Sequence, residues 1–295
     1  MKQPSKFKPF QSKLLKGMKK ITMISSSTLF HLLLLFSLFF SWFPNAKPQE
    51  IEDEREFSYI PGSPNGPERW GELHPEWEKC SNGMMQSPID LVYQRVRLDP
   101  SLGTLIRNYK ATNATLKNRG HDIMLEWVGD VGSLSIKGTV YFLKQIHWHS
   151  PSEHAINGTR YALEAHMVHQ SQDLKIAVIG IIYTIGSPDQ FLKKLENNIK
   201  QLTNTGVLQI DAGVVDPKDV RIEGNQYYRY MGSLTTPPCS ENVTWTIIKK
   251  IKTVSQEQVD LLREAVHDDA VNNARPLQPI NDRYIKLYKS FFFKT

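Results

Sequence analysis

Long apolar runs, an excess of positive charge after residue 46, and cysteine are all scarce or absent in this 295-residue sequence. Each scarcity argues against a class of protein. Outside residues 21–43 no apolar run is long enough to cross a bilayer, which argues against a multi-spanning membrane protein. Residues 1–46 carry seven lysines and no Arg, Asp or Glu, so the net charge of +6 becomes −1 for the remainder, and a nucleic-acid-binding function loses its main support. Only two cysteines are present, whereas structural zinc sites usually depend on cysteine.

The domain organisation that the sequence predicts is simple. From Trp70 to Phe293 there is no linker, repeat or low-complexity tract, which favours a single domain. Residues 47–70 are rich in charge, Pro and Gly, and we expect them to form an extended arm that leads into the domain. With 40% apolar residues, a chain of this length can bury a sizeable core.

The N-terminal segment, residues 1–46, is typical of a secretory signal. A lysine-rich stretch precedes the uncharged apolar run Leu29–Phe43, and we place the cleavage site near Ala46. Translation from Met18 or Met23 would give a signal of more ordinary length. A retained anchor is the alternative, because residues 21–43 are just long enough to span a bilayer of about 30 Å.

The cysteines and the glycosylation sequons agree with export. An even pair, Cys80 and Cys239, favours a disulfide in an oxidising compartment, with two buried free thiols as the alternative. Three sequons point the same way, although each alone is a weak signal. They begin at Asn113, Asn157 and Asn242.

The body of the sequence is mostly strand-like. The runs rich in β-branched and aromatic residues are 138–149, 162–169, 176–185 and 243–251. Two helices are expected to interrupt them. One begins at Ser187 with Pro188 at the first helical position, and the other begins at Ser255.

The stretch from Gln145 to His154, QIHWHSPSEH, holds three of the nine histidines. Alternate side chains of a strand share a face. One face is therefore expected to carry Tyr141, Leu143, Gln145, His147 and His149. The dipeptide Asn157-Gly158 is a strong hairpin signal, and a two-residue loop there places His149 opposite His166. Opposed residues point to the same side of a sheet, and a register shift of two residues would preserve that facing.

Three neutral imidazoles with an open fourth position describe a catalytic zinc site. We therefore predict that His147, His149 and His166 bind Zn²⁺. Ligating imidazoles usually donate their second N–H to an acceptor, and Gln145 and Glu164 share faces with His147 and His166, respectively. For each histidine taken alone, the alternative is an ordinary surface or hydrogen-bonded residue.

These residues resemble the α-class carbonic anhydrases, over most of the chain from Tyr59 to about Tyr288. Eight motifs carry the resemblance: NGPERW (65–70), QSPID (86–90), NRGH (118–121), QIHWH (145–149), SEH (152–154), EAHMVH (164–169), GSLTTPPC (232–239) and NARP (273–276). The two cysteines, the signal and the sequence GHDIM at 120–124 look most like the plant branch of that family.

The resemblance implies a mainly β fold of the α+β type. Residues 47–295 would form a single domain around a large, mostly antiparallel, twisted central sheet with a few peripheral helices. It also implies the reversible hydration of carbon dioxide to bicarbonate and a proton, by attack of a hydroxide bound to the zinc of the three histidines. Glu153 would accept the hydroxyl proton of Thr235, and Thr235 would then orient the attacking group.

The resemblance further implies an apolar pocket for carbon dioxide beside the metal. Its residues would be Val168, Val178, Leu234, Thr235, Thr236, Val243 and Trp245. His121 matches the proton shuttle, because a histidine with a pKa of about 6.5 can accept and release a proton. Tyr59 matches a residue of the solvent network. The alternatives are ordinary core positions for the apolar residues and a surface histidine for His121.

Two rival functions remain open. One is a catalytically weak storage or binding protein on the same fold, although such relatives typically lose zinc histidines and all three are present here. The other is a secreted metallohydrolase on a different fold, which gives no reason for pairing Glu153 with Thr235.

We expect an extracellular or apoplastic location, with the chloroplast stroma reached through the secretory route as the alternative. We expect a monomer or homodimer without a nucleic-acid partner, and no stable membrane insertion after signal cleavage.

Overall fold

The computed structural model describes residues 49–51, 53–266 and 272–290, so the predicted signal at residues 1–46 lies outside the described residues. The strands are β1 (Val96–Leu98), β2 (Ile106–Tyr109), β3 (Thr112–Asn118), β4 (Ile123–Trp127), β5 (Gly132–Ile136), β6 (Thr139–His149), β7 (Leu163–Ser171), β8 (Ile176–Ile185), β9 (Gln209–Val215), β10 (Gln226–Ser233), β11 (Glu241–Ile248), β12 (Lys252–Val254) and β13 (Ile285–Lys289). The α-helices are α2 (Trp70–Leu73), α3 (Lys79–Asn82), α4 (Gln190–Thr205) and α5 (Gln256–Val266). Short 3-10 helices are η1 (Glu54–Glu56), η2 (Pro75–Trp77), η3 (Tyr93–Arg95), η4 (Pro100–Leu102) and η5 (Pro217–Val220).

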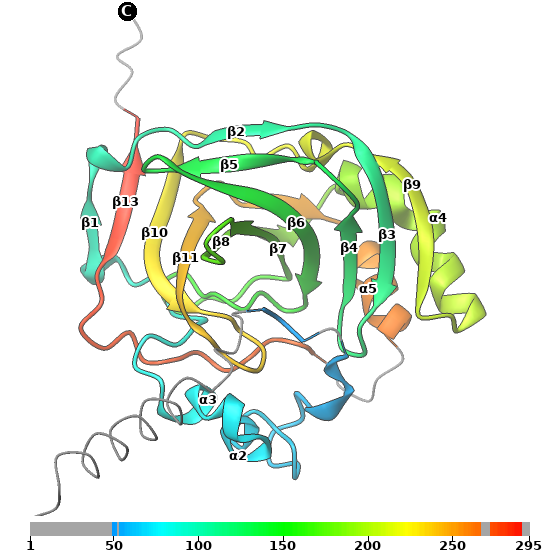
Figure 1. The fold of residues 1–295 in the computed structure, drawn as a ribbon, viewed down its shortest axis with the longest axis horizontal. Coiled ribbons are helices and arrows are strands. Elements are labelled where there is room, and N and C mark those ends of the chain that lie inside the picture. The colour runs from blue at the N-terminus through cyan, green and yellow to red at the C-terminus, as the bar shows by residue number, and fades with distance from the viewer. Residues whose placement is uncertain (1–48, 52, 267–271, 291–295) are drawn as a thin grey trace, which may run out of the picture. The chain divides into compact units, whose positions relative to one another are not determined.

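The thirteen strands form one sheet within a compact unit, Lys47–Thr295 (Figure 1). Its strand order is β1-β13-β10-β11-β8-β7-β6-β4-β3-β9, with β2, β5 and β12 beside that path. Nine of the twelve strand pairings are antiparallel and three are parallel. The predicted mainly β, mostly antiparallel fold with few helices is therefore confirmed.

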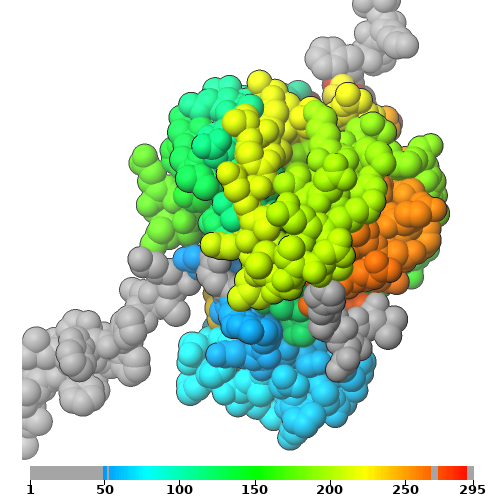
Figure 2. All heavy atoms as spheres, turned by 90° about the vertical axis from the view of Figure 1, so that its right-hand side faces the viewer, coloured from blue at the N-terminus to red at the C-terminus, as the bar shows by residue number. Residues whose placement is uncertain are grey.

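The central strands are buried on both faces. In β7, Ala165 and Met167 contribute to one apolar core and Val168 to a second core on the opposite face. Helices α4 and α5 belong to the first core and lie side by side, with β9 next to α4 (Figure 2). The helical face that α4 buries consists of Phe191, Leu192, Leu195, Ile199 and Leu202. The second face of the sheet is left for the candidate site.

The predicted start of α4 is two residues too early. Asp189 is the N-cap, because its Oδ1 accepts hydrogen bonds from the backbone N–H groups of Phe191 (3.0 Å) and Leu192 (3.1 Å). Pro188 precedes this cap and does not occupy the first helical position. A carboxylate that satisfies two N–H groups decides where the helix begins.

The predicted side-chain alternation in β6 is wrong before Gln145. Leu143 and Gln145 lie opposite consecutive residues of β7, so Lys144 is an extra residue in a β-bulge. The bulge reverses the facing, and Tyr141 and Leu143 join the core that α4 and α5 cover. Gln145 and the two histidines that follow it face the other way.

The predicted turn forms, but the predicted register of β6 and β7 is wrong by two residues. Asn157 and Gly158 both have positive φ, and Ile156 pairs with Thr159 around them. Further along the hairpin, His166 lies opposite His147, whereas the predicted partner of His166 was His149. A shift of two residues preserves the facing, so the error leaves all three histidines on one side of the sheet.

The predicted disulfide is present between Cys80 and Cys239. The two half-cystines pack in a small core with Phe57, Trp70 and Trp77. Phe57 belongs to the segment before the sheet, which we call the N-terminal arm and define as the described residues between 49 and 57. This arm, drawn in blue in Figure 1, is packed against the domain.

Candidate metal centre

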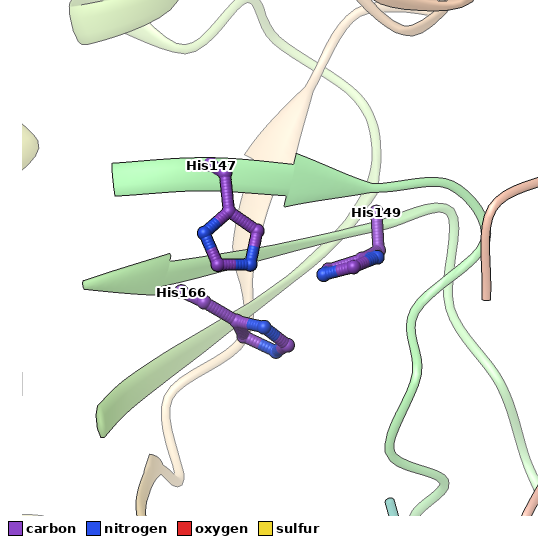
Figure 3. Close-up of side chains that lie close together, drawn as sticks. All are labelled: His147, His149 and His166. Atoms are coloured by element: carbon purple, nitrogen blue, oxygen red, sulfur yellow. The ribbon is translucent and has the colours of Figure 1, made fainter. Parts of the chain in front are cut away.

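Three histidines converge on one space beside the paired strands β6 and β7 (Figure 3). His147 and His149 project from β6 and His166 from β7, and each is only 1% exposed. One ring nitrogen from each lies within 4.8 Å of the other two. Sheet geometry produces this arrangement, because alternate residues of β6 share a face and His147 directly opposes His166. The structure therefore brings together the three predicted zinc ligands.

The other ring nitrogen of each histidine faces a hydrogen-bond acceptor. The pairs are His147 Nδ1 with Gln145 Oε1 at 2.9 Å, His149 Nδ1 with the Asn273 carbonyl oxygen at 2.7 Å, and His166 Nε2 with Glu164 Oε1 at 2.9 Å. Each acceptor requires a hydrogen on the nitrogen that it contacts. A neutral imidazole then presents the lone pair of its remaining nitrogen to the shared space.

These donors fit a zinc ion. His149 Nε2 is buried and has no hydrogen-bond partner among the described residues, which is costly unless a further group satisfies it. Burial, with Arg119 and the other two histidines nearby, holds the pKa of His147 well below its usual value and favours the neutral form that ligates metals. Three imidazole nitrogens without a thiolate are the donor set of a catalytic rather than a structural zinc site.

Glu153 lies beside the converging nitrogens. Its Oε1 accepts a hydrogen bond from the backbone N–H of Arg275 (2.9 Å), while Oε2 lies 3.6 Å from His149 Nε2 and 3.9 Å from His166 Nδ1. That Oε2 is buried without a hydrogen-bond partner among the described residues, and no hydrogen bond there joins Glu153 to Thr235. Thr235 itself is buried, and the buried hydroxyl of Thr236 likewise lacks a partner in the described residues.

The carboxylate behind His166 is the centre of a buried polar chain. Glu164 Oε1 accepts from His166 and also faces His154 Nδ1 at 2.7 Å, while Oε2 accepts the backbone N–H of His154 at 2.8 Å. His154 Nε2 is 2.6 Å from the Tyr230 hydroxyl, which lies 2.8 Å from Ser87 Oγ. Burial alone would raise the pKa of Glu164, but the two imidazoles and their hydrogen bonds lower it well below its usual value. This acceptor is therefore held as an anion.

Space for that carboxylate depends on a glycine. Gly180 of β8 lies opposite His166 in the sheet. A Cβ atom at this position would come within 2.9 Å of Glu164 Oε1 and 2.6 Å of Ile247 Cδ1. The absence of a side chain therefore lets β8 pack closely against the group that orients His166.

An apolar wall adjoins the same histidine. The five predicted apolar pocket residues lie in one buried cluster: Val168, Val178, Leu234, Val243 and Trp245. The indole ring of Trp245 is centred 4.8 Å from the ring of His166 and donates from Nε1 to the Ser233 carbonyl oxygen (2.8 Å). The wall thus presents hydrocarbon beside the converging nitrogens, while its one polar group is already satisfied.

His121 and Tyr59 lie together against the N-terminal arm. His121 is 8% exposed, and its Nε2 is 2.5 Å from the Phe57 carbonyl oxygen. Its ring packs edge-to-face with Tyr59. The Tyr59 hydroxyl is buried without a partner among the described residues, and burial raises its pKa well above the usual value. In this arrangement His121 is held by the arm and is not presented to solvent.

Arg119 forms the centre of a charged cluster that the sequence analysis missed. Its guanidinium donates to Asp122 through two nitrogens, donates to Glu50 (2.9 Å) and lies 3.4 Å from Glu54. The side chains of Arg119, Glu54 and Asp122 are almost completely buried. Two of the four residues come from the N-terminal arm, where the composition predicts only an extended segment, so no local pattern identifies them.

Asn273 and Arg275 belong to the NARP sequence at 273–276, for which the sequence predicted no function. Asn273 supplies the carbonyl oxygen that orients His149, and Arg275 holds Glu153 through its backbone N–H. The buried guanidinium of Arg275 also donates to Gln86 Oε1 (2.8 Å) and to the Cys80 carbonyl oxygen (2.9 Å). It thereby connects the disulfide region to Glu153. The match of this motif to the family was the available signal, but the residue types do not show that Asn273 and Arg275 act through backbone atoms.

The remaining sequence predictions concern the surface and membranes. The sequon residues Asn113, Asn157 and Asn242 are all exposed. Among the helices of the described residues, none has both the length and the apolar composition required to cross a bilayer.

Known proteins show which family this architecture belongs to. The family model for eukaryotic-type carbonic anhydrase matches residues 65–289. Dioscorin DB3S of Dioscorea polystachya is 55% identical over 272 residues, which cover 92% of this chain and 99% of that protein. Alpha carbonic anhydrase 7 of Arabidopsis thaliana is 53% identical over 240 residues, which cover 81% of this chain and 87% of that protein.

A solved structure of dioscorin complexed with ascorbate is also similar to this one. It has a TM-score of 0.79 and 53% sequence identity, and the match covers 80% of this chain and 99% of that chain. Family model, relatives and fold agree, and the relatives named here include plant proteins. The chain therefore belongs to the eukaryotic-type, or α-class, carbonic anhydrase family.

Proposed function

We propose that this protein catalyses the zinc-dependent, reversible hydration of carbon dioxide to bicarbonate and a proton. The observation that carries the proposal is the convergence of three imidazole nitrogens, each on a ring whose other nitrogen faces an acceptor. Zinc at such a site supplies Lewis-acid chemistry that makes water nucleophilic near neutral pH. His147, His149 and His166 would hold the ion.

The residues around this site have separable tasks in the proposed reaction. Gln145, the Asn273 carbonyl and Glu164 fix the tautomers of the three imidazoles. Trp245 and the apolar cluster around it offer carbon dioxide a surface that does not compete through hydrogen bonds. Glu153, held by Arg275, keeps an oxygen available for the Thr235 hydroxyl, which would orient the nucleophile.

His121 remains our proposed proton carrier. Its contact with the Phe57 carbonyl oxygen means that the ring must leave the N-terminal arm to exchange a proton with solvent. Replacement by alanine should therefore slow turnover in dilute buffer and have little effect in concentrated buffer. Equal buffer dependence in the wild type and His121→Ala would remove His121 from the mechanism.

A second candidate function is a storage or binding protein with weak catalysis. It is favoured by the identity of 55% to a dioscorin and by the similarity to a dioscorin structure that holds ascorbate. On this alternative, the apolar wall and the histidines would bind a small organic molecule without efficient turnover.

One experiment separates the two candidates. The protein is produced in an oxidising host, stripped of metal and tested for carbon dioxide hydration by stopped flow, with and without one equivalent of zinc. Fast hydration that requires zinc supports the enzyme, and His149→Ala should abolish both zinc retention and nearly all of the activity. Zinc binding with hydration at the uncatalysed rate would instead leave the storage or binding function.

We also propose that residues 1–46 are a cleaved secretory signal and that residues 47–295 form the mature domain. The disulfide supports passage through an oxidising compartment, and the exposed sequons are accessible to glycosylation. The proposed destination is the apoplast, with the chloroplast stroma as the alternative, and the proposed assembly is a monomer or homodimer. Mass spectrometry of the secreted protein, which reads its first residue and its glycans, tests the first two proposals.

A further inference from the structure

The N-terminal arm reaches the metal centre through one carboxylate. Glu50 Oε2 accepts a hydrogen bond from Gln145 Nε2 at 2.9 Å and another from the Arg119 guanidinium at 2.9 Å. The same oxygen lies 3.8 Å from His147 Nδ1, and the Glu50 side chain is only 12% exposed. Glu50 precedes residues 65–289, the segment that the carbonic anhydrase family model matches. Its contact is therefore an addition to the matched part of the chain.

The chemistry of this contact fixes the orientation of the Gln145 amide. An ionised carboxylate can only accept hydrogen bonds, so the NH2 end of Gln145 must face Glu50. The carbonyl end of the amide then faces His147 Nδ1, at 2.9 Å. A carbonyl oxygen can only accept, which places a hydrogen on Nδ1 and leaves the lone pair on Nε2 for the metal.

The opposite orientation of the amide would oppose zinc binding. If the Gln145 NH2 group faced His147, it would donate to Nδ1 and stabilise the tautomer that carries its hydrogen on Nε2. That hydrogen would point toward the metal site, and the ring would have to change tautomer before it could ligate. The two ends of an amide are similar in size, so shape alone discriminates weakly between the orientations. A charged acceptor discriminates strongly.

Glu50 is itself fixed by Arg119. The guanidinium is held by Asp122 through its Nε (2.8 Å) and a second nitrogen, and it lies beside Glu54, so its position does not depend on Glu50 alone. Planar, several-pronged contacts of this kind set direction as well as distance. A chain of contacts thus runs from Arg119 through Glu50 and Gln145 to His147.

We infer that Glu50 is a positioning residue for the metal site, which orients the Gln145 amide and thereby selects the metal-binding tautomer of His147. This inference rests on the proposed zinc site. Glu50 makes no hydrogen bond to His147, and the hydrogen bonds that connect the two residues run through Gln145. Removing it should weaken zinc binding without removing a ligand.

The test is zinc affinity, measured by competition with a chromophoric chelator at pH 7. Loss of a partner that orients a metal ligand typically costs about 10–100-fold in metal affinity. Because Glu50 acts through another residue, Glu50→Ala should raise the zinc Kd by about tenfold, at the lower end of that range. Glu50→Gln retains a carbonyl acceptor for Gln145 and should recover most of the affinity. Glu56→Ala is the matched control, because Glu56 lies in the same arm with a side chain 61% exposed and pairs only with the partly exposed His74 among the described residues.

A double-mutant cycle separates positioning from general damage to the fold. In a Gln145→Ala background, Glu50→Ala should have little further effect on zinc Kd, because the residue through which it acts is absent. In the metal-free protein, nitrogen-15 NMR of His147 should show that Glu50→Ala lowers the population of the Nδ1–H tautomer. Unchanged zinc Kd in Glu50→Ala, or an equal loss with and without Gln145, would overturn the inference while leaving the zinc site intact. Failure of the wild type to bind zinc would instead overturn the proposed function, and the inference with it.

Discussion

The two strands of the metal centre orient their histidines by different means. On the β7 side, His166 is held by Glu164, and the supporting chain continues through His154 and Tyr230, all of which are buried in the domain interior. On the β6 side, the support of His147 passes through Gln145 and leaves the sheet for Glu50 of the N-terminal arm. One side therefore depends on the core of the fold, and the other depends on a segment that has to dock onto it.

This difference predicts which substitutions change zinc affinity alone and which also change folding stability. A group such as Glu164, with all of its partners buried in the domain interior, cannot be changed without disturbing the packing around it. A group delivered by an arm can be altered while the sheet stays intact. We therefore expect changes on the β7 side to affect folding and metal binding together, and changes on the β6 side to separate the two.

The largest effect is expected for Glu164→Gln. The amide replaces an anion that accepts from two imidazoles and one backbone N–H, so one donor would face another donor. Zinc affinity should fall about 10–100-fold, and the free energy of unfolding should fall by about 3 kcal/mol. Chelator competition and urea unfolding measure the two quantities. A loss of zinc affinity at full stability would contradict the view that the β7 side couples them.

A second test removes the guanidinium on the β6 side. Arg119→Met leaves the acidic side chains of Glu50, Glu54 and Asp122 without their cation, and the free energy of unfolding should again fall by about 3 kcal/mol. Zinc affinity should fall about as far as in Glu50→Ala, because the hydrogen-bonded path from Arg119 to His147 runs through that residue. If Arg119→Met weakened zinc binding as severely as Glu164→Gln, the proposed separation between the two sides would be wrong.

The third effect depends on pH and concerns Glu54. Burial raises the pKa of this carboxyl well above its usual value, with Arg119 opposing the shift and Asp122, Glu50 and Glu153 adding to it. The folded state therefore keeps a proton that the unfolded state releases above about pH 4.5. Stability is consequently lost as pH rises from there through the folded pKa.

Glu54→Gln keeps the shape and removes this titration. The variant should gain stability relative to the wild type as pH rises from 5 to 8, and the gain should be small at pH 4. Urea unfolding over this range gives the comparison. A difference between the two proteins that stays constant with pH would show that Glu54 does not retain its proton on folding.

The smallest effect is expected for a substitution of Glu126, a partly exposed residue of β4 next to Gln145. Glu126 lies opposite Gln145 in the sheet and pairs with Lys117 at 2.7 Å, with both side chains partly exposed. Glu126→Gln should change the free energy of unfolding by less than about 1 kcal/mol. Zinc Kd should stay at the wild-type value, and a rise comparable to that of Glu50→Ala would assign the orientation of Gln145 to Glu126.

The sequence predicted the facing of the histidines better than their pairing. The face to which a strand side chain points alternates from one residue to the next, so a shift of two residues leaves it unchanged. The shift itself arises because six residues, 150–155, separate His149 from the Ile156–Thr159 bridge, whereas only four, 160–163, separate that bridge from Glu164, the partner of His149. Part of the longer side pairs with Asp90, a contact that no short-range pattern encodes.

Of the polar residues around the site, only some could be identified from the sequence. Gln145 and Glu164 could be found from the sequence, because each lies two residues from its histidine on the same strand face. Asn273, Arg275 and Glu50 are distant in sequence, and two of them act through backbone atoms. Their functions follow from the tertiary structure and leave no mark in local spacing.

The position of Glu50 in the chain has a consequence for protein engineering. A chimera that joined the sheet of this protein to the N-terminal segment of a relative would retain all three histidines and every residue of the matched segment. It would nevertheless lose the acceptor that orients Gln145, unless the incoming segment supplied one. The arm and the sheet should therefore be exchanged as one module, and residues before the recognised domain belong in any transplant of this metal site.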